Sequence, residues 1–418
     1  MADDGGPNDF SVLTRRRFLR GASLAGGLGL ASACKYGTQL FLTRKPPEAG
    51  AQQAAWAESR VRSHRPLGKT GFEMSDISFG TSGLGDAAVA RRGVERGINY
   101  FDTSPDYSRA GSETALGEGV KGTPRDRLFL VSKFCTADGH LATDTPVPRV
   151  VEAVEGSLRR LGTDYLDLCH VHACNSIDRL MAPNIHEAFD RLKQAGKVRF
   201  LGVSSHTPDL ETVMAHAVDS GRFDVIMVAY NFKNWPDLSH IFHRAHERGV
   251  GVVAMKTLKG ALHTQLAEFT PTERESFAQA AFKWVLSNPD VSGLVVSMSR
   301  LEQVDEYLYA SGQPPTASDL SILDKYDRLI ARDYCRPGCG ACLDACPYDV
   351  PVDDVMRYTM YAERYGRERE AMRSYARLDP SRNGSRCASC SAPCEASCPF
   401  ELPIREKLVR ADHLLRWS

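Results

Sequence analysis

The sequence lacks an excess of charge of either sign, because 52 Lys and Arg residues balance 52 Asp and Glu residues in a chain of 418 residues. Without a field of one sign, we expect no nucleic acid as a partner. No uninterrupted apolar run reaches about 18 residues, so the sequence predicts no membrane-spanning helix. Any attachment to a membrane would then have to be through an anchor. Hydrophobic residues make up 42% and charged residues 25%, which excludes disorder, collagen and coiled coil.

Cysteine is scarce through most of the chain. Only Cys34, Cys135, Cys169 and Cys174 precede residue 335, whereas the other eight of the 12 cysteines lie between Cys335 and Cys398. Such clustering is typical of a metal site.

The N-terminus carries a targeting pattern. Residues 14–20 read T-R-R-R-F-L-R, and residues 21–33 are rich in Gly and Ala, with the length of an h-region. This pattern resembles a twin-arginine export signal, which implies export to the periplasm or cell envelope. The alternative is a disordered basic tail. We predict a signal over residues 1–34 and a linker over residues 35–65.

Two interpretations apply to the end of this segment. Residues 31–33 read A-S-A, which suits a small-residue cleavage site. Together with Cys34 they also resemble a degenerate lipobox that lacks the usual Leu, so that Cys34 is a candidate lipid anchor. The sequence leaves cleavage and lipidation open.

Short β-branched or apolar runs alternate with amphipathic helical stretches from Leu67 to about Ile330, and we count eight of each. The helical stretch 150–161 carries one apolar stripe and ends at Gly162. The predicted strands are centred on residues 77–79, 99–101, 128–132, 166–171, 198–203, 225–228, 250–254 and 293–296.

Eight β-α units in about 265 residues predict a closed TIM (β/α)8 barrel over residues 66–330. The alternative is an open doubly wound sheet, which normally shows a G-x-G-x-x-G turn after its first strand. No such turn follows residues 77–79. In a closed barrel, catalytic side chains lie just past the carboxyl ends of the strands.

Four polar side chains follow the predicted second, third and fourth strands. Asp102 and Tyr107 come after the second strand, Lys133 ends the third, and His172 lies at the end of the fourth. A buried Lys133 ammonium is expected to favour the phenolate form of Tyr107, while Asp102 keeps the lysine charged. Tyr107 is then a usable acid, and His172 can donate a hydrogen bond to a substrate carbonyl. No side chain supplies a hydride.

The run G-I-N-Y-F-D-T-S-x-x-Y ending at Tyr107, the strand-terminal Lys133 and the run D-Y-L-D-L-x-x-x-H ending at His172 resemble the aldo-keto reductase superfamily. The resemblance implies NADP or NAD as cofactor and a small carbonyl or alcohol as substrate. It also implies that Asp102, Tyr107, Lys133 and His172 form a catalytic tetrad with Tyr107 as general acid. A barrel with a core His and a structural Asp–Lys pair is the alternative.

Several residues fall where that family contacts its cofactor. The resemblance implies contacts from Thr81, Asp102, Ser204, Ser205, Tyr230, Lys256, Ser297, Arg300 and Gln303. The chain also departs from the family, which more often has Asn at Ser205 and Gln at Met227. Gln303 replaces a usual Arg and Tyr307 a usual Asn, so Arg300 is left to pair with a 2′-phosphate. We still expect dinucleotide binding, because helix N-termini and backbone amides carry much of phosphate recognition.

Isolated Cys and His residues also occur on these strands or at their ends. They are Cys135, Cys169, Cys174 and His170. A second metal site there is conceivable, although such residues more often simply pack in a core.

Two four-cysteine runs repeat in the last part of the chain. Three, two and three residues separate the cysteines of the first run and two, three and three those of the second, and each run ends in Cys-Pro; the runs are Cys335, Cys339, Cys342, Cys346 and Cys387, Cys390, Cys394, Cys398. They resemble the two-cluster ferredoxin pattern, in which the fourth cysteine of each run ligates the other [4Fe-4S] cluster. The cysteines here are spaced more widely than the two, two and three residues of that pattern. The sequence therefore leaves open whether the fourth cysteine of each run ligates the other cluster. Zinc and disulfides are the alternatives.

The stretch 355–378 is rich in Arg, Glu and Tyr at helical spacing, and residues 403–408 read P-I-R-E-K-L. These features resemble a branch of aldo-keto reductases with a C-terminal ferredoxin-like domain, so we predict an α-helical domain of that kind over residues 331–418. The helix is expected to pack against the barrel. The full prediction is an exported reductase that carries two [4Fe-4S] clusters and has an electron-transfer protein as a possible partner. The alternative is a non-catalytic barrel that docks a partner while the clusters carry electrons.

Overall fold

The computed structural model describes residues 55–206, 208–233, 237–258, 269, 276–336, 339–364 and 367–416. The predicted signal, the linker up to residue 54 and the candidate anchor Cys34 lie outside the described residues. Within the described ranges, no helix combines the length and apolarity needed to cross a bilayer.

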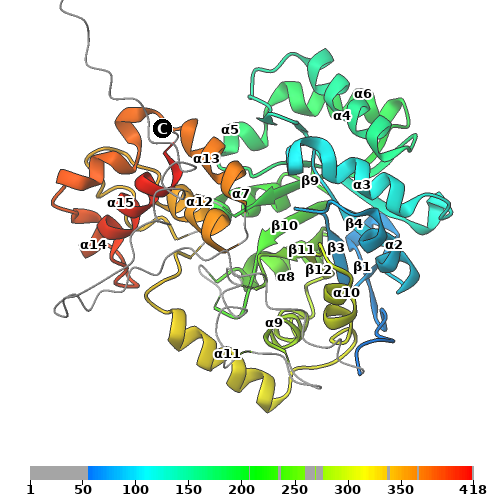
Figure 1. Cartoon of the computed structure of the whole chain (residues 1–418). Coiled ribbons are helices and arrows are strands. Elements are labelled where there is room, and N and C mark those ends of the chain that lie inside the picture. The colour runs from blue at the N-terminus through cyan, green and yellow to red at the C-terminus, as the bar shows by residue number, and fades with distance from the viewer. Residues whose placement is uncertain are drawn as a thin grey trace, which may run out of the picture. The chain divides into compact units, whose positions relative to one another are not determined.

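Eight parallel strands form a closed barrel (Figure 1). They are β3 (Ile77–Gly80), β4 (Tyr100–Asp102), β5 (Phe129–Lys133), β8 (Leu166–Val171), β9 (Val198–Ser205), β10 (Val225–Ala229), β11 (Gly251–Met255) and β12 (Gly293–Ser297). The ring closes where β12 pairs with β3, with Leu294 opposite Ile77. The predicted barrel is therefore confirmed, and the open sheet was the wrong alternative.

Strand residues alternate between the barrel interior and the layer beneath the helices. On β10, Val225 and Met227 lie in an interior cluster with Leu168, whereas Ile226 and Val228 pack in the outer layer. This period of two is the pattern that a strand buried on both faces requires.

Helices surround the barrel. They are α2 (Ala87–Glu95), α3 (Gly111–Val120), α4 (Val147–Leu161), α5 (Ile177–Leu180), α6 (Pro183–Gln194), α7 (Leu210–Asp219), α8 (Ser239–Glu247), α9 (Phe277–Leu286), α10 (Leu301–Leu308) and α11 (Ala317–Ile330). Helix α4 buries Val150, Val154 and Leu158, and it ends at Gly162, whose φ of 66° is the left-handed cap that glycine favours. The predicted helix 150–161 is confirmed and begins three residues earlier than expected.

The packed chain begins before residue 66, where we had expected it. Trp56 is buried, with its ring centroid 6.4 Å from that of Tyr309. The backbone amide of Arg62 donates to Ser311 Oγ at 2.8 Å. The hairpin of β1 (His64–Pro66) and β2 (Glu73–Ser75) follows and carries Met74 into the interior cluster. Residues 56–65 are therefore packed onto the barrel, because a buried indole and backbone hydrogen bonds hold them there.

A small hairpin follows β5 at the carboxyl end of the barrel. Its strands are β6 (Cys135–Thr136) and β7 (Gly139–His140). The loop after β4 forms the 3-10 helix η2 (Tyr107–Ala110). These short elements bring side chains over the strand ends, where the site is built.

The C-terminal region has a hydrophobic cluster of its own. Its helices are α12 (Val352–Arg364), α13 (Glu368–Ala376), α14 (Pro393–Ala396) and α15 (Ile404–Leu415). Between residues 331 and 416, the part that the structure describes contains helices and turns but no strand. The predicted helical stretch 355–378 is thus two helices, α12 and α13.

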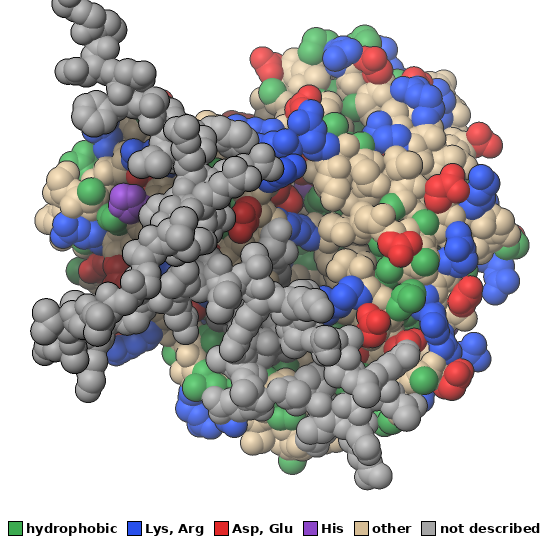
Figure 2. Space-filling view, viewed as in Figure 1, with side chains coloured by type: hydrophobic (Ala, Val, Ile, Leu, Met, Phe, Trp, Pro, Cys, Tyr) green, Lys and Arg blue, Asp and Glu red, His purple; other side chains and the backbone are tan. Residues whose placement is uncertain are grey.

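Charged side chains of both signs are interspersed over the described part of the face in Figure 2. Ion pairs along one helix, such as Arg191 with Glu187 and Arg328 with Asp324, also bring opposite charges together.

Candidate active site

The carboxyl ends of β4, β5 and β8 bring the four predicted side chains together. Lys133 Nζ donates to Asp102 Oδ1 and to the Thr103 carbonyl oxygen, both at 2.7 Å. Lys133 is 2% exposed and Asp102 is 3% exposed, so water does not screen this ion pair. Asp102 ends β4 and Lys133 ends β5, which makes the pair a direct consequence of neighbouring parallel strands.

Tyr107 lies between the lysine and the histidine. Lys133 Nζ lies 4.9 Å from the centre of the Tyr107 ring. The rings of Tyr107 and His172 meet edge to face with centroids 6.0 Å apart. Ser108, Arg109 and Ala110, directly after Tyr107, all have positive φ values between 51° and 68°. Non-glycine residues rarely adopt this conformation, and such strain is concentrated at functional sites.

The Tyr107 phenol differs from the expected phenolate. Burial raises the pKa of Tyr107 well above its ordinary value, and the carboxylates of Asp102 and Asp106 raise it further. The expectation that Lys133 would favour the phenolate is wrong here, because the ammonium is bound to Asp102 and the Thr103 carbonyl. Tyr107 therefore keeps its proton, and with its pKa raised the phenol is a weaker acid than the sequence predicted.

His172 is held neutral, and its Nδ1 lies beside a thiol and a carboxylate. Burial lowers its pKa well below the ordinary value, and the nearby His140 and Lys133 lower it further. Cys135 Sγ lies 3.2 Å from His172 Nδ1. Burial raises the pKa of Cys135 well above its ordinary value, so the thiol can donate to Nδ1. The imidazole proton then lies on Nε2, from which it can be donated.

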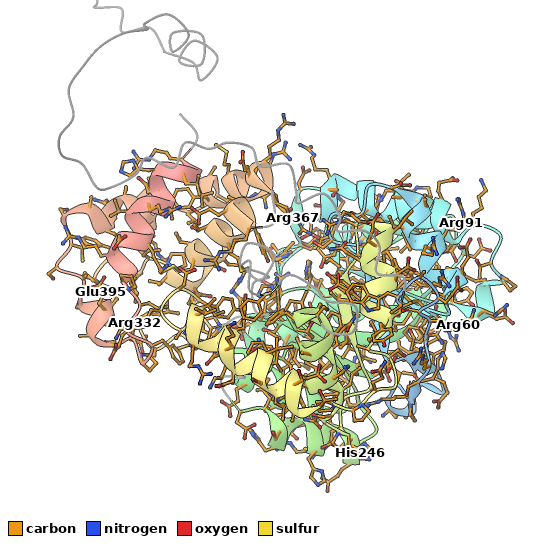
Figure 3. The ribbon with its side chains drawn as sticks, turned by 60° about the horizontal axis from the view of Figure 1, so that its bottom comes forward. Arg60, Arg91, His246, Arg332, Arg367 and Glu395 are labelled. Carbon is orange, nitrogen blue, oxygen red and sulfur yellow. The ribbon has the colours of Figure 1, made fainter. Side chains whose placement is uncertain are left out.

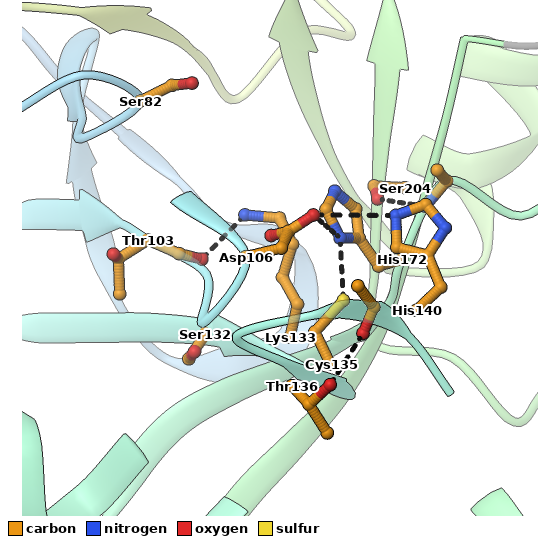
Figure 4. A network of polar contacts seen from close by, with 12 residues as sticks. Ser82, Thr103, Asp106, Ser132, Lys133, Cys135, Thr136, His140, His172 and Ser204 are labelled. Carbon is orange, nitrogen blue, oxygen red and sulfur yellow. Dashed lines mark hydrogen bonds and ion pairs between the residues drawn. The ribbon is translucent and has the colours of Figure 1, made fainter. Parts of the chain in front are cut away.

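Sequence reasoning missed Asp106 and His140 at this site and named Cys135 only with Cys169, Cys174 and His170, whereas the structure places Cys135 with Asp106, His140 and His172. Asp106 directly precedes Tyr107 and Cys135 follows Lys133 by two residues, so their positions beside predicted site residues were a usable signal. His140 is brought in by the β6–β7 hairpin, and its ring centroid lies 4.5 Å from that of His172 (Figure 4). Only the tertiary structure shows that contact.

The C-terminal region also reaches the strand ends. Tyr361 of α12 accepts a hydrogen bond from Lys256 Nζ at 2.9 Å. Arg357 donates to the His206 carbonyl at 3.3 Å. Arg367 donates to the Ser82 hydroxyl and carbonyl, at the junction that Figure 3 shows. As predicted, the Tyr- and Arg-rich segment packs against the barrel.

Tyr361 lies among cations at this junction. Burial raises the pKa of its phenol, but the nearby cations outweigh burial, and the net pKa is lowered from its ordinary value. These cations are Lys256, Arg357 and Arg367. Lys256 also has a positive φ of 58°, so its backbone is strained where it meets Tyr361.

The candidate cofactor residues of the first and fifth strands are buried near the tetrad. Thr81 Oγ1 donates to Thr103 Oγ1 at 2.7 Å, next to the carbonyl that binds Lys133. Ser204 Oγ accepts from the Ala173 amide at 3.1 Å, and Ser205 is fully buried. Asp102 Oδ2 is buried and has no hydrogen-bond partner among the described residues.

Tyr230, directly after β10, does not point where a cofactor contact was expected, while Met227 on β10 is the departure from the family that the sequence indicated. The Tyr230 ring packs between Phe242 and Trp284, with centroids 5.0 and 5.2 Å away, in the layer beneath the helices. It therefore faces away from the barrel interior, and its expected cofactor contact is corrected. Met227, at the position of the usual Gln, fills the interior cluster.

The candidate phosphate residues lie at the start of α10. Ser297 and Arg300 are exposed. Gln303 is already engaged, because its Oε1 accepts from the amides of Ser299 and Arg300 at 2.8 and 3.2 Å. The side chain thus caps the helix, as a residue at this position does in a capping box.

The eight clustered cysteines line two small cavities. The first cavity is lined by Cys335, Cys339, Cys342 and Cys398, and the second by Cys346, Cys387, Cys390 and Cys394. Each cavity thus takes three cysteines of one run and the fourth cysteine of the other. All of these thiols are free of disulfides.

Comparisons with known proteins cover the barrel. The model of the aldo/keto reductase family matches residues 76–328, so the match ends before the clustered cysteines. L-galactose dehydrogenase of Arabidopsis thaliana is 32% identical over 279 residues, which cover 59% of this chain and 87% of that protein. The uncharacterized oxidoreductase YqkF of Bacillus subtilis is 26% identical over 281 residues, covering 59% and 90%.

Solved structures of aldo-keto reductases also resemble this part of the chain. Aldo-keto reductase AKR11C1 from Bacillus halodurans, in its holo form, has a TM-score of 0.53 and 27% identity, covering 63% of this chain and 95% of that chain. A putative aldo-keto reductase of Pseudomonas aeruginosa has a TM-score of 0.51 and 25% identity, covering 64% and 99%. Both likenesses concern a part of the chain that is the size of the barrel.

Proposed function

The chain belongs to the aldo/keto reductase family, and we propose that it is an NAD(P)H-dependent oxidoreductase that interconverts a small carbonyl compound and its alcohol at Tyr107. One observation carries the proposal. Asp102, Lys133, Tyr107 and His172, which come from the ends of three strands and the loop after β4, meet in one cluster in which only Tyr107 is partly exposed. A cluster of this composition can bind a carbonyl oxygen and deliver a proton to it.

The roles of the chain's own side chains follow from their protonation. A bound nicotinamide cofactor would supply the hydride for the carbonyl carbon. Tyr107, which holds its proton, gives that proton to the carbonyl oxygen, and His172 orients the same oxygen through its Nε2–H. Asp102 holds the Lys133 ammonium 4.9 Å from the centre of the Tyr107 ring, where the ammonium offsets part of the negative charge that Tyr107 gains as it gives up its proton.

Several groups near the tetrad and at the start of α10 fit a bound nicotinamide cofactor. Asp102 Oδ2 is a buried acceptor that no described residue satisfies, and such an oxygen suits a ligand that donates a hydrogen bond. Thr81, Ser204 and Lys256 would hold the cofactor near the tetrad, and Ser297 and Arg300 would meet its phosphates at the start of α10. NADP is supported by the family, while Gln303, already used as a cap, is a poor partner for a 2′-phosphate.

The test is a titration of purified protein with NADPH and NADH, followed by turnover on aldehydes, ketones and sugars. We expect binding of at least one cofactor and a fall in kcat of about 10²- to 10⁴-fold in Tyr107→Phe. Tyr107→Phe should leave cofactor affinity unchanged, because the phenol acts on the substrate. Equal turnover by the variant and the wild type contradicts the role of Tyr107.

We also propose that the C-terminal region holds two [4Fe-4S] clusters, one in each cavity. Four thiols per cavity fit the thiolate ligation of such clusters, and the exchange of the fourth cysteines follows the two-cluster ferredoxin pattern. The clusters would pass electrons to a partner protein or hold the region together. About eight iron and eight sulfide ions per chain are expected, and a content of zinc alone contradicts the proposal.

We propose export by the twin-arginine route to the periplasm or cell envelope, from residues 14–20 and the stretch that follows. Arg15→Lys with Arg16→Lys in the full chain should hold the protein in the cytoplasm, as cell fractionation would show. Mass spectrometry of the exported chain distinguishes cleavage before Cys34 from lipidation on it. Export of the double variant at the wild-type rate contradicts the signal.

A second candidate is a non-catalytic barrel that docks a partner while the clusters carry electrons. The packing of Tyr230 away from the barrel interior and the use of Gln303 as a cap favour it. The cofactor titration separates the two functions, because a docking barrel binds neither NADPH nor NADH.

A further inference from the structure

Four side chains with metal-binding atoms meet beside the tetrad. They are Asp106 in the loop after β4, Cys135 and His140 on the β6–β7 hairpin, and His172 after β8, and their ligand atoms all lie within 4.8 Å of one another. Figure 4 shows the carboxylate, the sulfur and the imidazoles turned toward a common point. Three separate segments of the chain thus converge on one spot.

The distances are close to those between the ligands of a tetrahedral metal ion. Cys135 Sγ lies 3.2 Å from His172 Nδ1, and Asp106 Oδ2 lies 3.6 Å from the same nitrogen. Asp106 Oδ2 also lies 3.7 Å from His140 Nε2. Bonds of about 2.0 Å to nitrogen or oxygen and 2.3 Å to sulfur place tetrahedral ligands roughly 3.3–3.7 Å apart. These three of the six ligand pairs already have the required spacing, and pairs that lie as far as 4.8 Å apart would have to approach by roughly 1 Å to bind an ion.

We propose that Asp106, Cys135, His140 and His172 bind one zinc ion at the mouth of the barrel. One thiolate, two imidazoles and one carboxylate form a borderline-soft donor set that suits zinc, whereas calcium and magnesium prefer oxygen ligands. The identity of the donors therefore selects the metal, and their number fills its coordination shell.

An independent observation supports a cation here. Asp106 Oδ1 is buried and has no hydrogen-bond partner among the described residues. A buried carboxylate oxygen without a partner is costly unless a cation lies beside it. Its neighbour in the same carboxylate, Oδ2, faces both imidazoles of the set.

The zinc ion would fix the orientation of His172. Coordination through Nδ1 leaves the proton on Nε2, the nitrogen that the proposed reaction needs as a donor. With four protein ligands no open position is left for water, so the ion is a structural support of the site. A hydrogen bond from the Cys135 thiol to Nδ1 would select the same tautomer without a metal, and metal analysis separates these two arrangements.

The experiment measures zinc in the full-length protein after exposure to zinc and removal of the excess. We expect about one zinc per chain, with a zinc K-edge absorption spectrum of one sulfur and three nitrogen or oxygen ligands. His140→Ala and Cys135→Ala should each lose at least nine-tenths of this zinc. The His140 side chain is 40% exposed, so its removal is compatible with folding.

Variants of residues outside the proposed ligand set serve as matched controls for the position of the zinc ion. Cys174→Ala, which removes another buried barrel cysteine, and His243→Ala, which removes an exposed imidazole of α8, should keep the zinc. Tyr107→Phe should keep it too while losing turnover, so failure of the reductase proposal is distinguishable from failure of the metal site. Absence of zinc from the wild type, a four-sulfur spectrum, or full zinc in His140→Ala overturns the proposal.

Discussion

The barrel and the C-terminal region bury their interiors in different ways. The barrel closes a ring of hydrogen-bonded strands around an interior cluster and covers it with a larger apolar layer beneath the helices. The C-terminal region has no strand among its described residues, and its small core includes Cys387 and Cys394. Two of its buried core residues are thus thiols, which the proposal assigns to metal ligation. The comparison teaches that the barrel is stable by packing, whereas the stability of the C-terminal region would depend on the proposed clusters as well as on its small core.

The strongest test of this comparison is removal of one thiol from the second cavity. If the region holds the proposed clusters, Cys394→Ala should lower its iron content and unfold α12 to α15, because metal binding and folding are coupled in such sites. Hydrogen exchange should rise in residues 352–415 and stay unchanged in the barrel strands. Cys174→Ala, a buried barrel cysteine, is the matched control and should leave exchange in residues 352–415 unchanged. Unchanged exchange in Cys394→Ala would mean that apolar packing alone holds the region.

The next test breaks an ion pair inside the barrel. Lys133→Met leaves the Asp102 carboxylate buried without its partner, which should lower the free energy of unfolding by about 3–5 kcal/mol and abolish turnover. The double variant Lys133→Met with Asp102→Leu should regain most of the stability and none of the activity. Iron content should be normal in both, and a parallel loss of iron would contradict the independence of the two regions.

A third test opens a cavity where the N-terminal hairpin closes the barrel. Leu67 is fully buried, and its side chain lies against Gly251. Leu67→Ala should lower the free energy of unfolding by about 2–5 kcal/mol in chemical denaturation. Leu320→Ala on α11, where the side chain is half exposed, should change it by less than about 0.5 kcal/mol. Similar losses in both variants would contradict packing as the source of barrel stability.

The smallest expected effect on the free energy of unfolding comes from the contact between the barrel and the C-terminal region. Tyr361→Phe removes the hydrogen bond to Lys256 and should cost about 0.5–1.5 kcal/mol. The folded pKa of Tyr361 is lowered, so its contribution is largest above the unfolded pKa of about 10 and is lost as pH falls through the folded pKa. The stability difference between wild type and variant should therefore widen as the pH rises from neutral toward the unfolded pKa of about 10. A difference that stays constant would show that the phenol does not ionise there.

The alternation of short apolar runs with amphipathic stretches in the sequence was sufficient to predict the barrel. Each predicted strand lies within two residues of an observed one, because strands buried on both faces form short apolar runs between amphipathic helices. The order of parallel strands then placed Asp102 beside Lys133, and the motif that ends at His172 placed the imidazole at the next strand end. The prediction failed at Tyr230, whose ring direction depends on the local course of the loop after β10.

The sequence by itself determined the alternation of strands and helices, the strand-end tetrad and the two cysteine runs, because these are local patterns with a fixed period or spacing. Only the tertiary structure decided which cysteines share a cavity, that His140 meets His172, and that Tyr361 bonds Lys256. These contacts join residues that are distant along the chain, so their distances depend on loop conformations and helix packing. No spacing in the sequence encodes such distances, since each depends on the whole path of the chain between the two residues.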